Sequence, residues 1–328
     1  MIHLKKIYWI AAFLTIAVLV WLSLYLEDQS AKNIKSASVF GASFAQAHAQ
    51  YLGLDWKKTY LAYLDDLKVR LLRLQANWNQ IEPKQGRFNF ADIDWQIKEA
   101  GKRGAKVILA VGRKLPHWPE CHDPKWISNL TEPEIQNRVL GMLEATVKRY
   151  KGNPTITVWQ LENEPFFPFG NCPAADDAFL EKEAALLRSI DARPILITDS
   201  GELSTWLKPA ELADIIGTTM YRVTWNPLWG YFYYPLSPQF YRLKAKLINH
   251  NIPVIVSELQ VEPWGSKPLP EMTIAEQYQS MNPKRIQEIT NFAKQTNFSQ
   301  VYLWGAEWWY YLKEKGHPEI WNFARSLF

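Results

Sequence analysis

The sequence predicts a (β/α)8 barrel, in which eight parallel strands each lead into a helix. Short apolar runs alternate with helical patterns eight times over roughly 290 residues, a length typical of such barrels. The runs are continuously apolar, as expected for strands that are covered on both faces. An open doubly wound sheet is the alternative, but it usually carries a glycine-rich turn after its first strand, and Gly41-Ala-Ser-Phe-Ala-Gln is no such turn.

Each strand and helix is assigned from this alternation. The eight strands are expected at 39–43, 69–74, 106–111, 155–161, 194–198, 214–219, 253–257 and 300–304. The helices are expected at 55–68, 91–103, 131–150, 174–190, 209–212, 238–250, 283–296 and 318–328. The third helix has the clearest start, because Thr131 and Glu134 have the spacing of a capping box.

An apolar segment precedes the barrel. Residues 7–26 carry no charge, and twenty helical residues span roughly 30 Å, about the thickness of the hydrocarbon core of a bilayer. Lys5 and Lys6 precede this segment, so the positive-inside rule places the N-terminus in the cytoplasm. We therefore expect a cytoplasmic tip at 1–6, a signal anchor at 7–26 that spans the lipid bilayer once, a stalk at 27–38, and an extracytoplasmic barrel at the cell membrane. A cleaved signal peptide is the alternative, although no clear small-x-small site follows the segment.

The composition narrows the class of partner. The formal charge of +4 is mild and not clustered, so nucleic-acid binding is not suggested. Aromatic residues are abundant, with 16 Trp, 15 Tyr and 15 Phe. Most are expected to build the core, but the aromatic segment 221–238 either packs onto the barrel or forms the wall of a groove.

The two cysteines, Cys121 and Cys172, follow predicted strands three and four, which are neighbours in a barrel. Outside the cytoplasm such a pair can oxidise, and the disulfide would close a loop of about fifty residues. Two free thiols are the alternative. Because only His122 lies nearby and no Cys-x-x-Cys is present, we expect no metal site, and no cofactor motif is found either.

Two glutamates stand at the carboxyl ends of predicted strands, where the active sites of barrels are found. Strand four ends in Glu162-Asn163-Glu164-Pro165, and strand seven ends in Ser257-Glu258. Paired carboxyl groups are the minimum equipment for cleaving a glycosidic bond by acid/base and nucleophilic catalysis. Polar or aromatic residues also follow the other strands, among them Arg73, Trp78, Tyr221, Trp304 and Glu307.

These motifs resemble those of the clan A glycoside hydrolases, retaining (β/α)8 enzymes with glutamates after strands four and seven. Asn163-Glu164-Pro165 is similar to the acid/base motif of the clan, and Ser257-Glu258 to its nucleophile strand. The segment Trp78-Asn-Gln-Ile-Glu82-Pro83 is similar to one found in several of its families. Other features resemble families 5, 35, 39 and 42, and the resemblance extends over most of 39–311.

The resemblance implies that Glu164 is the acid/base and Glu258 the nucleophile. A carboxylate beside an arginine and a tyrosine hydroxyl keeps its charge, which suits a nucleophile. The acid must start protonated, so its pKa must be raised by burial and by the other carboxylate. The same resemblance implies substrate-binding or supporting roles for Arg73, Asn163, Tyr221 and Trp304, with Trp78 and Glu307 as further candidates for contact with the sugar.

The function expected is therefore that of a membrane-anchored retaining β-glycosidase that cleaves an external oligosaccharide or polysaccharide through a covalent glycosyl-enzyme. Two alternatives stay open. One is a carbohydrate-binding barrel without catalysis, and the other is a transglycosylase, in which a second sugar replaces water. Cellulase-like members often have a histidine where this chain has Thr219, and this departure leaves the sugar open.

Overall fold

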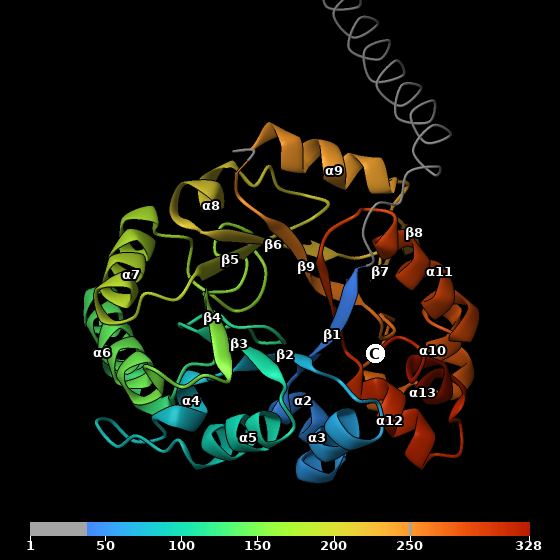
Figure 1. Cartoon of the computed structure of the whole chain (residues 1–328), viewed down its shortest axis with the longest axis horizontal. Coiled ribbons are helices and arrows are strands. Elements are labelled where there is room, and N and C mark those ends of the chain that lie inside the picture. Colours follow the sequence, from blue (N-terminus) through green and yellow to red (C-terminus); the bar gives the residue numbers. More distant parts are fainter. Residues whose placement is uncertain (1–37, 249–250) are drawn as a thin grey trace, which may run out of the picture.

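The computed structural model describes residues 38–248 and 251–328, and these form a closed barrel of eight parallel strands (Figure 1). The order around the barrel is β1-β10-β9-β6-β5-β4-β3-β2, so the predicted (β/α)8 barrel is confirmed. The barrel strands are β1 (Val39–Phe44), β2 (Leu71–Gln75), β3 (Lys106–Val111), β4 (Ile156–Leu161), β5 (Ile195–Asp199), β6 (Ile215–Met220), β9 (Val254–Gln260) and β10 (Gln300–Trp304).

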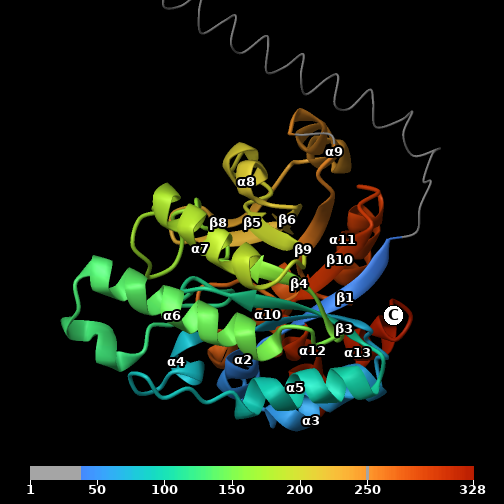
Figure 2. The ribbon, with the colours of Figure 1, turned by 60° about the vertical axis from the view of Figure 1, so that its left-hand side comes forward.

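Helices surround the barrel, as Figures 1 and 2 show. The long helices of this outer layer are α3 (Trp56–Asp65), α5 (Ala91–Lys102), α6 (Glu132–Tyr150), α7 (Asp177–Ile190), α9 (Pro238–Leu247) and α11 (Pro283–Lys294). Shorter helices complete it: α2 (Gln46–Tyr51), α4 (Trp78–Ile81), α8 (Leu207–Leu212), α10 (Ile274–Ser280), α12 (Glu307–Glu314) and α13 (Glu319–Ala324). Helix α6 begins with the predicted capping box of Thr131 and Glu134.

Apolar side chains fill part of the barrel interior. Ile108, Leu196, Ile255 and Tyr302 come from four strands and form one buried cluster. The ring of Tyr302 fits because its neighbour on β1 is Gly41, where a Cβ atom would lie 2.9 Å from Cε1 of Tyr302. Larger apolar clusters pack the outer faces of the strands against the helices, so the strands are covered on both faces as their composition predicts.

The long aromatic segment after β6 contains an antiparallel hairpin of β7 (Val223–Asn226) and β8 (Gly230–Tyr233). Val223 is fully buried and Tyr231 packs against the core, whereas Trp229 at the turn is 79% exposed. The segment therefore packs onto the barrel through some residues and presents aromatic surface through others.

The predicted membrane anchor at 7–26 lies outside the residues that the structure describes. Within 38–248 and 251–328, no helix is both long enough and apolar enough to cross a membrane.

Candidate active site

Glu258 reaches the barrel interior because strand β9 is irregular at the residue before it. On β6, Thr218 pairs with Val256 and Thr219 pairs with Glu258, so Ser257 is an extra residue on β9. The pairing with β10 shifts at the same place. Such bulges redirect the following side chain, and they are frequent beside active sites.

The Glu258 carboxylate is held by one cation and one hydroxyl group. Arg73 donates from Nη1 to Oε1 of Glu258 at 2.7 Å, and the Tyr221 hydroxyl donates to Oε2 at 3.2 Å. Both interactions favour a charged carboxylate. Burial, followed by the charges of Glu258 and Glu164, raises the pKa of Tyr221 well above its usual value, so the phenol keeps the proton that it donates.

Arg73 is completely buried and its other donors fix two residues of strand β4 and its loop. Its Nε donates to Oε1 of Gln160 at 2.6 Å, and its Nη2 donates to Oδ1 of Asn163 at 2.9 Å. A buried guanidinium is costly unless it is paired and hydrogen-bonded, and here both conditions are met. One side chain thus connects the ends of strands β2, β4 and β9.

Glu164 follows β4 and is buried on the same side of the barrel. Its backbone N–H donates to Oγ1 of Thr198 at 2.8 Å, and the hydroxyl of Thr219 donates to its carboxyl Oε1 at 3.2 Å. Its φ of 44° lies in the left-handed region, which is uncommon for a residue other than glycine and frequent at functional sites.

The environment of Glu164 favours a protonated carboxyl group. Burial raises its pKa well above the usual value, and the negative charges of Glu258 and Glu120 raise it further, against the opposing charge of Lys114. Two glutamates in one site therefore have different surroundings: Arg73 contacts the carboxylate of Glu258, whereas no cationic side chain among the described residues donates to the carboxylate of Glu164.

Two further predicted residues present unpaired donors near this pair. Within the described part of the chain, Nδ2 of Asn163 and Nε1 of Trp304 are buried and have no hydrogen-bond partner. The Trp304 ring is partly exposed, and it stacks on His117 with ring centroids 4.7 Å apart. A bound ligand with hydroxyl groups could satisfy both donors.

Trp78 is not at this site, and its expected contact with substrate is wrong for this structure. It begins helix α4, is fully buried, and packs in a separate cluster with Ile127 and Met142. Its indole N–H donates to Oε2 of Glu82 at 2.8 Å, and Oε1 of Glu82 accepts from the backbone N–H of Gly86 at 2.6 Å. The segment that includes Trp78 and Glu82 therefore stabilises a loop.

Glu307 is also fully buried, so the sugar contact expected from its position after strand β10 is not seen. Its Oε1 accepts from the backbone N–H of Ala45 at 2.6 Å. Burial raises its pKa to about 7, and the nearby His48 opposes that rise. His48 contacts Glu262 at 2.7 Å and its ring lies 4.7 Å from the ring of His117. Glu307 thus belongs to a buried polar group with His48 and Glu262, and His48 contacts the ring of His117.

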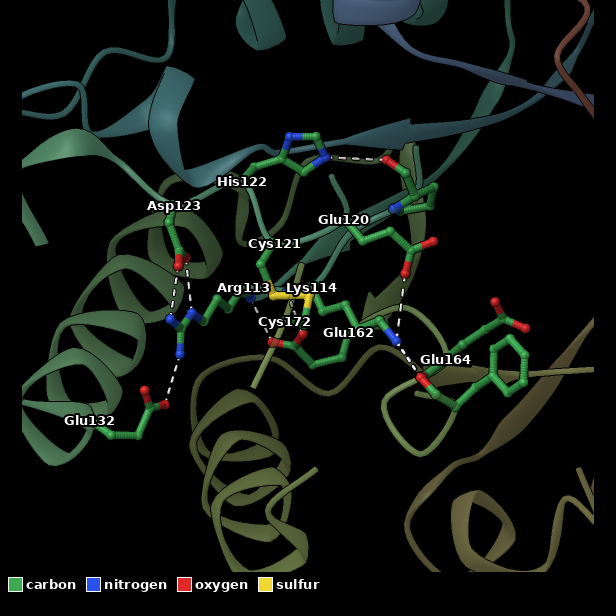
Figure 3. The surroundings of a disulfide bond; sticks show 12 residues. Arg113, Lys114, Glu120, Cys121, His122, Asp123, Glu132, Glu162, Glu164 and Cys172 are labelled. Atoms are coloured by element: carbon green, nitrogen blue, oxygen red, sulfur yellow. Dashed lines mark hydrogen bonds and ion pairs between the residues drawn. A yellow bond between two sulfur atoms is a disulfide. The ribbon is translucent and has the colours of Figure 1, made fainter. Parts of the chain in front are cut away.

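The loops that follow β3 and β4 are joined by several contacts, which Figure 3 shows around the disulfide. Cys121 and Cys172 form a disulfide with their Cα atoms 5.3 Å apart. The ammonium group of Lys114 donates to the backbone carbonyls of Glu164 at 2.9 Å and Phe167 at 2.7 Å. The backbone that carries Glu164 is therefore fixed from the neighbouring loop.

Sequence reasoning gave Glu162 no firm role, and the structure gives it a clear one. Its two carboxyl oxygens accept the backbone N–H groups of Arg113 and Lys114, each at 2.6 Å. Burial raises its pKa, and the two backbone donors oppose this rise. Glu183 on α7 pairs with it, and burial together with the Glu162 charge raises the pKa of Glu183 well above its usual value. Glu162 positions Lys114, and Lys114 in turn positions Glu164.

Glu120 is the site residue that sequence reasoning missed. It lies in a loop between Pro119 and Cys121, and the sequence offers no strand-end signal for it. Its Oε2 lies 3.5 Å from the ammonium group of Lys114, which also donates to the backbone carbonyl of Glu164, and its charged form raises the pKa of Glu164. Among residues 38–248 and 251–328, no group of three His, Cys, Asp or Glu side chains is arranged to hold a metal ion.

Comparisons with known proteins find similarity to glycoside hydrolases over parts of the chain. A β-galactosidase family model, glycoside hydrolase family 42, matches residues 55–138. The β-galactosidase Pbg of Clostridium perfringens is 29% identical over 138 residues, which are 34% of this chain and 20% of that protein. Mannan endo-1,4-β-mannosidase 7 of Arabidopsis thaliana is 26% identical over 144 residues, 37% of this chain and 33% of that protein. These alignments span no more than a third of the curated relatives.

The fold is shared with solved enzymes of low sequence identity. Xylanase 10B of Thermotoga maritima superposes with a TM-score of 0.55 at 17% identity, covering 84% of this chain and 85% of the xylanase. Glu164 follows β4 and Glu258 lies on β9 of this shared barrel. The chain is thus similar in sequence to glycoside hydrolases of several families, and it shares its barrel fold with solved enzymes of this kind.

Proposed function

We propose that this protein is a retaining β-glycosidase that uses Glu258 as nucleophile and Glu164 as acid/base. The observation that carries the proposal is the difference between the two carboxyl groups. Glu258 is bonded to Arg73 and Tyr221, which favours a carboxylate, whereas burial and neighbouring charge keep a proton on Glu164.

In the first step Glu258 attacks the anomeric carbon of the bound sugar and a covalent glycosyl-enzyme forms. The bond to the leaving oxygen breaks, and Glu164 gives its proton to that oxygen. As Glu258 loses its charge, one cause of the raised pKa of Glu164 is removed. Glu164 is then better suited to remain a carboxylate.

In the second step Glu164 accepts a proton from water as that water attacks the glycosyl-enzyme. The bond to Glu258 breaks, and its carboxylate returns to the guanidinium of Arg73. The proton is back on Glu164, so the cycle closes without a cofactor. Another sugar in place of water would give transglycosylation by the same residues.

Two unpaired donors support binding of a sugar at this position. Nδ2 of Asn163 is free to donate to a sugar hydroxyl while its Oδ1 stays on Arg73. The partly exposed ring of Trp304, backed by His117 and Tyr221, offers a flat face on which a sugar ring can stack. The relatives act on different sugars by name, β-galactosides and mannan, so we propose a β-glycoside and commit to no single sugar.

A screen of aryl β-glycosides and soluble β-linked polysaccharides tests the proposal. The wild-type protein should cleave at least one of them, and Glu258→Gln should lower the rate at least ~100-fold. Glu271→Gln, which changes an exposed glutamate in a surface loop, is the matched control and should retain the rate. Cleavage by Glu258→Gln at the wild-type rate would contradict the assignment, and a protein that binds these glycans without cleaving any would be a carbohydrate-binding barrel.

We also propose that residues 7–26 anchor the enzyme in the cell membrane with the barrel outside. The support is the uncharged run of twenty residues and the two lysines before it. The protein should remain in the membrane fraction after a carbonate wash, and protease added from outside should reach the barrel. A mature form that begins after residue 26 would show a cleaved signal peptide instead.

A further inference from the structure

Glu120 is held in place more tightly than an ordinary loop residue. Its backbone N–H donates to the carbonyl of His117 at 2.8 Å, and its own carbonyl accepts from Leu115 at 2.9 Å. The next residue, Cys121, is bound to Cys172. The neighbouring β4 loop approaches so closely that a Cβ at Gly170 would lie 2.9 Å from Cβ of Glu120. These contacts fix the position from which the carboxyl group projects.

The carboxyl group of Glu120 has no sufficient partner in the protein. The side chain is only 5% exposed, and within the described residues its Oε2 has no hydrogen-bond partner. The ammonium group of Lys114 lies 3.5 Å from this same Oε2, which is an ion-pair distance, and it also donates to two backbone carbonyls. A buried carboxyl oxygen without a hydrogen bond is unfavourable and calls for a ligand.

The carboxyl group of Glu120 lies close to the loop that carries Glu164, because the Lys114 ammonium that is 3.5 Å from its Oε2 also donates to the backbone carbonyl of Glu164 at 2.9 Å. Burial raises its pKa to about 8, Lys114 opposes the rise, and the charge of Glu258 adds to it. The charge of Glu120 in turn raises the pKa of Glu164. Figure 3 shows Lys114 between Glu120 and the backbone of Glu164. A carboxyl group can accept a hydrogen bond from a hydroxyl group in either protonation state.

We propose that Glu120 binds substrate directly, forming a hydrogen bond with a hydroxyl group of the reacting sugar. This assignment rests on the proposed glycosidase function and names a residue that selects the sugar. A site built to bond a hydroxyl group rejects analogues that lack it.

The test combines Glu120 variants with deoxy substrates. Glu120→Ala should lower kcat/KM about 10- to 100-fold on the aryl β-glycoside that the wild type cleaves best. The same substrate is then supplied as its 3-, 4- and 6-deoxy forms. On the form that lacks the bonded hydroxyl, wild type and variant should have nearly equal kcat/KM, because the interaction is absent from both.

Glu120→Gln keeps the shape of the side chain and serves if Glu120→Ala does not fold. Glu132→Gln, an exposed carboxyl on α6 that contacts Arg113, is the matched control and should behave as wild type on every substrate. An equal penalty on all deoxy forms, or no penalty on the parent substrate, would overturn the role of Glu120 and leave the proposed function intact. Failure of the wild type to cleave any glycoside would overturn both.

Discussion

At the scale of single residues, the site separates two glutamates by their surroundings. Glu258 receives hydrogen bonds from Arg73 and Tyr221, whereas Glu164 receives one from the hydroxyl of Thr219. Burial and the charges of Glu258 and Glu120 raise the pKa of Glu164, which suits a group that must start the reaction with a proton. The different roles proposed for the two glutamates thus follow from the side chains that contact each of them, since the residue type is the same.

Glu164→Gln tests the acid role through the leaving group. With a poor leaving group such as an alcohol, the variant should lose at least ~100-fold in rate, because no acid protonates the departing oxygen. With 2,4-dinitrophenol, which needs no proton, the first step should be almost unaffected and the glycosyl-enzyme should accumulate. Pre-steady-state release of dinitrophenol measures this, and equal losses on both substrates would contradict the role.

The same group sets the alkaline side of the pH profile. Glu164 acts in its protonated form, and burial with neighbouring charge raises its pKa. The wild-type kcat/KM should therefore hold above the usual pKa of a glutamate and fall only as the pH rises through the raised value. With the dinitrophenyl substrate, whose leaving group needs no proton, this fall should be absent from the wild type and from Glu164→Gln alike. An alkaline limb that persists with this substrate would assign the limb to another group.

At the scale of elements, the loops after β3 and β4 behave as one unit. The Cys121–Cys172 disulfide joins them, the backbone N–H of Asn171 donates to the carbonyl of Pro119 at 2.9 Å, and Lys114 bonds the carbonyl of Glu164. Glu162 fixes the start of the β3 loop through two backbone N–H groups. The acid/base is thus supported by residues that need not touch the sugar.

Replacing both cysteines by serine should expose the contribution of the disulfide. The cysteines are 51 residues apart, so the chain-entropy model gives a loss of about 4 kcal/mol in the free energy of unfolding. Urea unfolding of the wild type and the double variant measures the loss, and a reducing agent should affect only the wild type. Two alkylatable thiols in protein purified from its native compartment would show that the bridge does not form there.

At the scale of the whole molecule, the barrel could be predicted from the sequence because each strand is marked by residues that are adjacent in the chain. Each buried strand is a short apolar run, and the predicted strand at 106–111 matches β3 without any shift. Strand β9 is different: the prediction ended it at 257, whereas it continues to Gln260 through the irregularity at Ser257. That irregularity depends on pairing with two neighbouring strands, which no local pattern reports.

The candidate site could likewise be predicted only where a local sequence pattern marks the residue. The sequence could place five of the site residues together because each lies in or after the carboxyl-terminal half of a strand, and barrel strands end at one mouth. These residues are Arg73, Asn163, Glu164, Tyr221 and Glu258. Trp78 follows a strand too, but helix α4 turns its ring into the core. Glu120 was missed because it does not follow a strand directly. It lies in a loop whose position depends on the Cys121–Cys172 disulfide.

The central claim is that Glu258 forms a covalent bond to the sugar, and trapping that bond tests it most directly. The protein would be treated with a 2,4-dinitrophenyl 2-deoxy-2-fluoro-β-glycoside of the sugar identified by the screen, digested and analysed by mass spectrometry. If Glu258 is the nucleophile, the peptide that contains it should carry one added fluorosugar, and the same peptide of Glu258→Gln should carry none. A label on another residue, or an α product formed first from a β-glycoside, would contradict it.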